Sequence, residues 1–285
     1  GVQFMTTAYP MMSGMTAVSD DGRWLFLTVA GQGVRIYPLG DPPPTGLAGR
    51  YVFYNDSAFD GGSPDANADD DGAIATDKRP LLGTLRPGQA VTRDNYTTYT
   101  RGINGIMFDL VGVDAAEDVS ASDVELAVAR PGSATGWVDA PGAAVSVRRG
   151  AGASGSARVT LTWTDDRPRN TWLRVTVKPT ALTGLAAADV FYFGNLVGDA
   201  GGPASPPTVD ADDILTTRAA ISPGPVGLYS AADHNRDGRV NALDVLAARG
   251  NLSTTAALPL PDPTVAAART PTRRAPTRAT GLLRE

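Results

Sequence analysis

The stretch RVTLTWTDDRPRNTWLRVTV, Arg158–Val177, holds two runs in which apolar and polar residues alternate on either side of a polar turn. Alternation with a period of two puts every second side chain on the same face of a β-strand. We therefore expect Val159, Leu161 and Trp163 to share one face of a strand. The second run alternates in the same way, so the pair predicts two neighbouring strands.

Further runs of this kind fill the segment from Gly49 to Asn195. They are RYVFYN (Arg50–Asn55), GIMFDLVGV (Gly105–Val113), DVELAVA (Asp123–Ala129), AAVSVRR (Ala143–Arg149) and DVFYFGN (Asp189–Asn195). Many short strands in a chain with 32 glycines and 22 prolines are typical of a β-sandwich. The predicted fold is mainly β: a β-sandwich followed by a small α-helical module.

Composition excludes several classes of chemistry. The chain has no cysteine and one histidine, His234, so thiolate metal sites and multi-histidine zinc sites are excluded. The net charge of −5 argues against nucleic acid as a partner. No apolar run is long enough to cross a membrane. Chemistry that uses carboxylates alone stays open.

The chain divides into five expected parts. They are residues 1–40, the last blade-like piece of an upstream β domain; 41–48, a Pro-rich linker; 49–197, the β-sandwich; 198–257, a pair of loop-helix repeats; and 258–285, a disordered basic tail. The first part resembles one blade of a β-propeller, and an ordinary hairpin is the alternative. Because the sequence begins without Met or a signal peptide, we interpret it as the C-terminal part of a longer protein.

The segment DHNRDGRVNALD places oxygen-bearing residues at the spacing of a calcium loop. Ca²⁺ takes six to eight oxygen ligands, which a twelve-residue loop supplies from positions one, three, five, seven, nine and twelve. Those positions hold Asp233, Asn235, Asp237, Arg239 (through its carbonyl), Asn241 and Asp244. Gly238 occupies position six, where the loop turns sharply. His234 at position two is expected to point outward as a bystander.

The same segment, extended to DHNRDGRVNALDVLAARGN, resembles one copy of the dockerin type I repeat, D-x-N-x-D-G-x-V-N-x-x-D followed by a short helix. It departs from a full EF-hand in two ways: position twelve is Asp, and no helix is expected before the loop. The resemblance implies Ca²⁺ as the cofactor and a cohesin-like domain or cell-surface component as the partner. It places Ala242 and Leu243 at partner-contacting positions.

A second copy is expected upstream. In TVDADDILTTRAAI, Val209, Asp210 and Asp213 align with Val240, Asn241 and Asp244, and a helix follows over Ile214–Ala220. The first half of this loop lacks early carboxylates, although Asp199 lies at the start of a longer loop. We expect the first repeat to bind an ion weakly or not at all.

The β domain resembles an uncharacterised module found at the C-termini of large exported proteins of planctomycete-type bacteria. The stretches that carry this resemblance are VFYNDSAFDG, AIATDKRPLL, YTRGINGIMFDL and DVFYFGN. The resemblance implies an extracellular or cell-surface location, with the signal peptide upstream. Dockerins accompany polysaccharide-degrading systems, so polysaccharide is a further partner that the resemblance implies.

An acidic loop, Asp56–Asp77, contains seven aspartates. Clustered carboxylates repel one another unless a cation neutralises them. Two interpretations follow: a second Ca²⁺ site, or a solvated loop balanced by Lys78, Arg79 and Arg101.

Two alternative functions stay open beside calcium-dependent docking or anchoring. A carbohydrate-binding module would use exposed aromatic side chains; the candidates are Tyr96, Tyr99, Trp137, Trp163 and Trp172. A glycoside hydrolase domain needs two carboxylates in one cleft; the candidates are Asp165 and Asp166, and the glutamates are Glu117, Glu125 and Glu285. We expect this segment to be non-catalytic, with any hydrolase located upstream.

Overall fold

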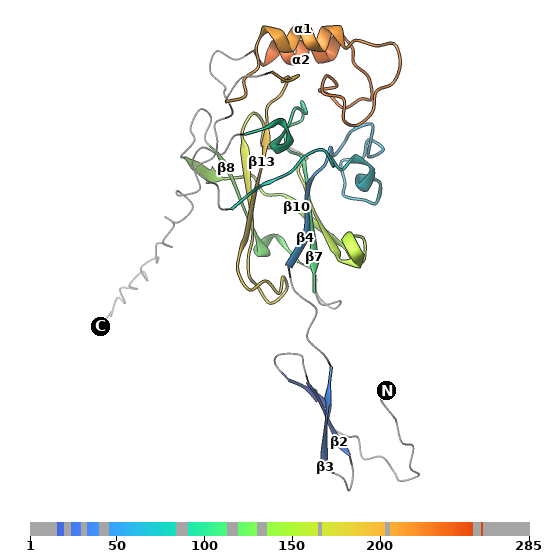
Figure 1. The fold of residues 1–285 in the computed structure, drawn as a ribbon, viewed down its shortest axis with the longest axis vertical. Coiled ribbons are helices and arrows are strands. Elements are labelled where there is room, and N and C mark those ends of the chain that lie inside the picture. The colour runs from blue at the N-terminus through green and yellow to red at the C-terminus, as the bar shows by residue number, and fades with distance from the viewer. Residues whose placement is uncertain are drawn as a thin grey trace, which may run out of the picture.

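The computed structural model describes residues 16–19, 24–29, 33–39, 46–83, 91–112, 119–129, 136–164, 167–202, 206–252 and 258. Within these residues the protein is mainly β, as predicted, with strands in three sheets and two α-helices near the C-terminal end (Figure 1). The tail after Leu258, the pair Asp165 and Asp166, and the glutamates Glu117 and Glu285 lie outside the described residues.

The first sheet contains the expected hairpin and one additional strand. It is antiparallel, in the order β1 (Thr16–Val18), β2 (Trp24–Val29), β3 (Gly33–Pro38). Its apolar side chains include Val34 and Ile36, which are 58% and 57% exposed. A single blade has this property because it cannot cover its own faces. The propeller-remnant interpretation stays a prediction.

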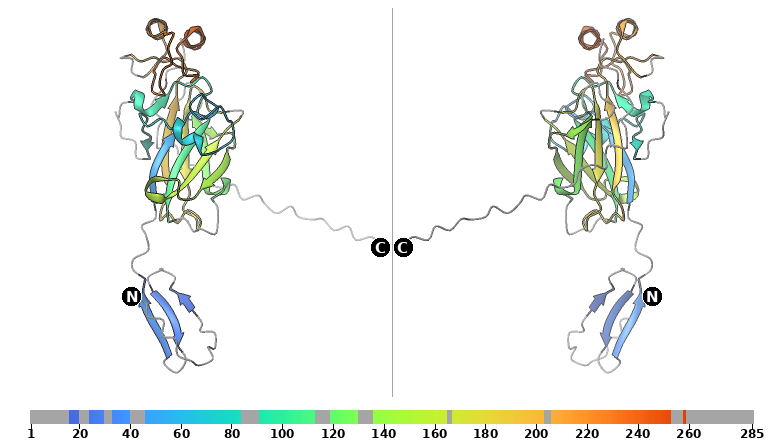
Figure 2. Two further views of the ribbon diagram at one scale, coloured as in Figure 1. Left: turned by 90° about the vertical axis from the view of Figure 1, so that its right-hand side faces the viewer. Right: turned by 90° about the vertical axis from the view of Figure 1, so that its left-hand side faces the viewer.

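Two further sheets form the predicted sandwich (Figure 2). One runs β10 (Ala144–Arg148), β11 (Ala157–Thr162), β7 (Gly105–Val111), β4 (Gly46–Val52). The other runs β5 (Leu81–Leu82), β13 (Asp189–Asn195), β12 (Trp172–Val177), β8 (Val124–Ala129), β9 (Trp137–Asp139), with β6 (Tyr96–Thr97) parallel to β13. Short 3-10 helices η1 (Asp69–Ala73), η2 (Arg93–Asn95), η3 (Ala121–Asp123) and η4 (Ala153–Gly155) lie in the connections.

The core lies between these two sheets. Val159 and Leu161 of β11 are fully buried, and Leu173 and Val175 of β12 are buried in the same cluster from the opposite sheet. Trp163 belongs to this cluster too, so the three residues expected on one face of the strand all reach the core. The outer face of β12 is also covered, because Trp172 packs in a second apolar cluster.

Two expected boundaries were wrong. Strand β4 begins at Gly46, inside the expected linker, because Leu47 pairs with Leu110 of β7 and extends the sheet edge. Leu258 was assigned to the disordered tail, yet it is 2% exposed. Its N–H donates to Pro207 O at 3.0 Å, and its side chain packs in the second cluster with Val209, which anchors the chain after the repeats.

The two helices lie side by side at one end of the sandwich (Figures 1 and 2). They are α1 (Ala211–Ala219) and α2 (Ala242–Gly250), and each begins at a capping box. The sandwich approaches α2 closely at Gly198, where an added Cβ would lie 2.7 Å from Ala248 Cα. In the described part of the chain, no helix has the length and apolar character needed to span a membrane.

Candidate metal centre

The loop before α2 buries a carboxylate that has one free oxygen. Asp233, at loop position one, is 0% exposed. Its Oδ2 accepts a hydrogen bond from Gly238 N–H at 3.0 Å, whereas its Oδ1 is buried and has no partner among the described atoms. A buried acceptor without a donor costs free energy. Burial raises the pKa of Asp233 to about 6; Arg236 opposes this shift, and Asp244 and Asp237 add to it.

Side chains at positions three, five and nine converge on one point. Asp237 Oδ2 accepts from Asn235 Nδ2 at 2.9 Å and from Asn241 Nδ2 at 3.4 Å. The nitrogen and oxygen of an amide have nearly the same shape. The oxygens of the two amides accept from Asp237 N–H at 3.1 Å and from Leu243 N–H at 2.8 Å. An amide that turned its oxygen toward the carboxylate would give up its backbone bond and add an oxygen of the kind that a hard cation requires.

The remaining loop positions are held by local hydrogen bonds and by one positive φ angle. Gly238 has φ +78°, a conformation that disfavours a side chain at the sharp turn. Arg239 N–H donates to Asp237 Oδ1 at 2.9 Å. Asp244, at position twelve, is fully buried, and its two oxygens accept from His234 N–H and Asn241 N–H. The carboxylate at the start of α2 therefore closes the loop.

The expectation for His234 was wrong in one respect. The side chain does not point outward: it is 0% exposed, and its Nε2 lies 3.1 Å from Thr217 Oγ1 of α1. Burial lowers the pKa of His234 to about 3, with Arg236 and Arg93 acting in the same direction. A neutral histidine therefore joins the loop of the second repeat to the helix of the first.

The loop does not gather enough carboxylates to hold an ion by carboxylates alone. Among the described residues, no three His, Cys, Asp or Glu side chains form a group that could hold a metal. An ion at this loop therefore depends on amide and carbonyl oxygens as well. The buried free oxygen of Asp233 fits such a set. Asn235 and Asp237 also line a cavity of about 650 Å³ that opens toward Asp56 and Arg101.

No pattern in the sequence indicates that this loop is attached to the sandwich. His234 O accepts from Thr100 N–H at 2.7 Å, and Arg236 O accepts from Ala58 N–H at 2.9 Å. Arg236 itself is 3% exposed and donates to Tyr54 Oη at 3.1 Å. An arginine in a loop is usually expected to be solvated, so only the tertiary structure reveals the contact between Arg236 and Tyr54.

The loop of the first repeat has the same hydrogen bonds to its last carboxylate as the second, but different side chains lie inside it. Asp213 Oδ1 accepts from Ala200 N–H at 2.8 Å and from Gly201 N–H at 3.2 Å, as Asp244 Oδ1 accepts from residues two and three of its own loop. Asp199 therefore stands at position one, although Asp199–Asp213 spans fifteen residues and Asp233–Asp244 spans twelve.

Side chains of the sandwich occupy this first loop. Arg93 Nη1 donates to Ala200 O at 2.8 Å, and Tyr96 Oη donates to Asp199 Oδ2. An added Cβ at Gly201 would lie 2.4 Å from Arg93 Nη1. The Arg93 guanidinium thus bonds two carbonyls at the start of the first loop.

The candidates for other functions are mostly buried. Of the aromatic residues considered for sugar stacking, Tyr96, Tyr99, Trp163 and Trp172 are 2% exposed or less. Trp137 is half-buried, with the Arg174 guanidinium 5.2 Å from its ring centre. These five residues form no exposed row. Glu125 pairs with Arg174 at 3.2 Å on the surface of the six-stranded sheet.

Comparisons with protein families, with curated proteins and with solved structures find no match to this chain.

Proposed function

We propose that this chain is a calcium-binding, dockerin-like docking or anchoring segment of an exported modular protein and is non-catalytic in itself. The observation that carries the proposal is the fully buried Asp233, whose Oδ1 has no partner, in a loop where Asn235, Asp237 and Asn241 converge. A bound cation would satisfy the free oxygen and neutralise the carboxylates.

Ca²⁺ is the ion that this donor set favours. Every ligand is an oxygen atom, from carboxylates, amides and the Arg239 carbonyl, and the loop contains no sulfur. Hard oxygen ligands without imidazole or thiolate are typical of Ca²⁺ or Mg²⁺ sites, and a flexible loop of many oxygens favours the larger ion. His234 is turned toward α1 and takes no part.

The helix pair supplies a surface for docking. Leu215 of α1 and Leu243 and Leu246 of α2 are 60%, 58% and 58% exposed. These helices lie at the end of the sandwich, beyond its strands (Figure 1). Exposed large apolar side chains on two packed helices are a feature of protein-binding surfaces. The proposed partner is a cohesin-like domain or a cell-surface component, in an extracellular setting.

Calorimetric titration of Ca²⁺ into the full chain tests the ion. The Asp233→Ala/Asp237→Ala variant is expected to bind one ion fewer than the unmodified protein. Asp212→Asn removes the charge of an exposed aspartate and serves as the matched control; it should leave the number of ions unchanged. Equal binding by the loop variant and the unmodified protein would contradict the proposal.

Docking has its own test. Surface plasmon resonance with recombinant type I cohesin domains should show binding in Ca²⁺ that disappears in EDTA. Leu243→Gln should abolish the binding and leave Ca²⁺ affinity unchanged, because Leu243 projects into solvent and the substitution adds no charge beside Asp244. Binding that persists in EDTA, or that survives Leu243→Gln, would rule out docking through this face.

A further inference from the structure

A second aspartate shares the features of Asp233. Asp70, in η1, is 0% exposed, and its Oδ1 is buried without a partner. Its Oδ2 accepts from Asn67 N–H at 2.9 Å, just as Asp233 Oδ2 accepts from a backbone N–H of its own loop. The turn that contains Asp70, residues 55–72, is called the acidic turn below.

Another free oxygen lies inside the acidic turn. Asn55 is 1% exposed, and its Nδ2 donates to Pro64 O at 2.9 Å, which places its amide within the turn. Its Oδ1 is buried and has no partner. Two side chains therefore bring unpartnered oxygens into one short segment. Buried acceptors rarely lack donors, so this coincidence calls for a ligand that provides positive charge.

The turn also holds a second buried carboxylate in a fixed position. Asp60 is 0% exposed; its Oδ1 accepts from Ser57 N–H at 2.8 Å and Gly62 N–H at 2.9 Å, and its Oδ2 accepts from Asp56 N–H. The segments that carry Asp60 and Asp70 pack together: an added Cβ at Gly61 would lie 3.8 Å from Asp69 Oδ2, and one at Gly72 would lie 3.2 Å from Phe59 O.

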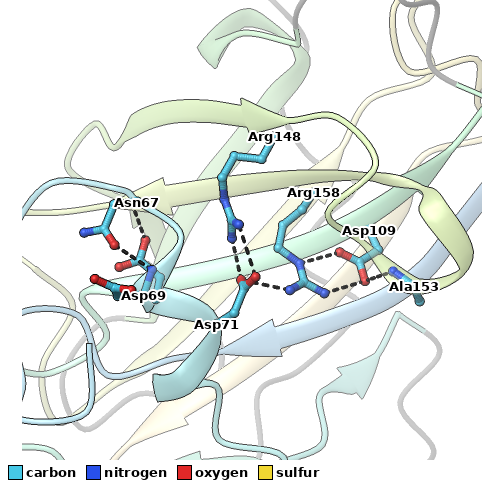
Figure 3. A network of polar contacts seen from close by, with 8 residues as sticks. Asn67, Asp69, Asp71, Asp109, Arg148, Ala153 and Arg158 are labelled. Carbon is cyan, nitrogen blue, oxygen red and sulfur yellow. Dashed lines mark hydrogen bonds and ion pairs between the residues drawn. The ribbon is translucent and has the colours of Figure 1, made fainter. Parts of the chain in front are cut away.

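Basic side chains neutralise the neighbours of these two carboxylates. Asp71 lies between Arg148 and Arg158, and Arg158 also pairs with Asp109 (Figure 3). Asp56 pairs with Arg101. Among the described residues, neither Asp60 nor Asp70 forms an ion pair. The positive charge near the acidic turn is therefore already engaged, and the buried pair has none of its own.

We propose that the acidic turn holds a second hard divalent cation of the Ca²⁺ class, with the free oxygens of Asp70 and Asn55 as ligands beside the Asp60 carboxylate. The site would have two buried carboxylates and amide oxygen, which agrees with the absence of any three-carboxylate group among the described residues. The cation would bind between Asn55, shortly after the end of β4, and η1. It would hold the acidic turn on the sandwich.

Equilibrium dialysis of ⁴⁵Ca²⁺ against the full chain at pH 7.5 tests this site. The unmodified protein should bind two ions and Asp70→Asn one. Asp94→Asn, which removes an exposed charge, should bind two. Asp233→Ala/Asp237→Ala should bind one, and the combination of this variant with Asp70→Asn none. The proposal is overturned if Asp70→Asn binds as many ions as the unmodified protein, or if the unmodified protein binds only the ion of the Asp233 loop.

The design separates this inference from the proposed function. If Asp233→Ala/Asp237→Ala retains every ion while Asp70→Asn loses one, only the proposed function fails. Asp70→Asn could lose the ion by misfolding, so a second measurement uses a protein in which the acidic turn is unchanged. Tyr99 Oη donates to Asn55 O at 3.1 Å, so Tb³⁺ bound in the turn of Asp233→Ala/Asp237→Ala should emit on tyrosine excitation. Added Ca²⁺ should displace the Tb³⁺ and so reduce the emission. A lack of Tb³⁺ emission in this variant would count against the site.

Discussion

The guanidinium of Arg236 lies over the ring of Tyr54, with 4.3 Å between the guanidinium carbon and the ring centre. Its Nη2 also donates to Tyr54 Oη, and its Nη1 to Ser230 O. Arg236 holds this position with φ 54°, which is uncommon for a residue with a side chain. Position four of the candidate calcium loop is thus inserted into the sandwich.

This contact would join ion binding at the loop to the stability of the β domain. The backbone carbonyls of His234 and Arg236 accept hydrogen bonds from Thr100 and Ala58 of the sandwich. A cation that fixes the loop would fix these acceptors as well. The loop is therefore a shared part of both units rather than an independent appendage.

Removal of the Arg236 side chain should destabilise the protein. We expect Arg236→Ala to lower the free energy of unfolding by about 2–3 kcal/mol, because buried hydrogen bonds and the stacking on Tyr54 are lost. Urea denaturation followed by tryptophan fluorescence measures this change. Arg239→Ala, an exposed arginine of the same loop, should change stability by less than about 0.5 kcal/mol. Equal effects of the two variants would show that the insertion carries no stability.

Ca²⁺ should stabilise the sandwich itself. Trp163 and Trp172 are buried in it and report its unfolding. Ligand at about 100 times Kd adds about 2.7 kcal/mol to a folded state that alone binds it. The thermal midpoint seen by tryptophan should therefore rise with Ca²⁺. The contribution of the loop is measured by comparing this rise in the unmodified protein and in Asp237→Ala. The rise should be smaller in the variant. A tryptophan transition that is indifferent to Ca²⁺ would mean that the loop and sandwich are uncoupled.

Arg93 should maintain the first repeat without any ion. We expect Arg93→Ala to cost about 1–3 kcal/mol, since Ala200 O and Asp199 O lose their donors. Arg79, which is exposed, provides the matched control, Arg79→Ala. The number of bound Ca²⁺ ions, measured by calorimetry, should stay the same in both variants. A gain of one ion in Arg93→Ala would show that the arginine blocks a competent site.

Asp213 should give the protein a measurable pH dependence. Burial raises its pKa from 3.8 to about 6, and the neighbouring Asp199 adds to this, while N–H groups of Asp210 and Ala200 act in the opposite direction. The unfolded chain releases this proton near pH 4 and the folded chain near pH 6. The folded state thus binds more protons between these values, so its stability falls as pH rises from about 4 to 6.

The Asp213→Asn variant removes this contribution. In EDTA, its free energy of unfolding should fall less steeply between pH 4 and pH 7 than that of the unmodified protein. Urea denaturation at a series of pH values measures the two slopes. The comparison cancels contributions from other buried aspartates, which both proteins share. Parallel slopes would contradict a raised pKa at Asp213.

Local patterns predicted the elements that depend on neighbours in sequence. Strand β13, Asp189–Asn195, matches its expected limits. The turn at Gly238 follows from residue type at a fixed position of the loop. Alternation and loop spacing act within a few residues, so sequence alone is sufficient to place them.

Long-range contacts could not be predicted in this way. The sequence around Arg236 does not predict its contact with Tyr54, which is 182 residues away in the chain. The burial of His234 against Thr217, and the entry of Arg93 into the first loop, likewise depend on how the repeats pack on the sandwich.

The sequence by itself determined the mainly β fold, the approximate positions of the longer sandwich strands and the oxygen-rich loop from Asp233 to Asp244, because periodicity and spacing are local properties. Only the tertiary structure decided which charges are buried without partners and which are neutralised. Asp70 and Asp71 are adjacent in the chain, yet Asp71 meets Arg148 and Arg158 while Asp70 Oδ1 meets no donor. Burial and charge pairing arise from segments far apart in sequence, and folding alone brings them together.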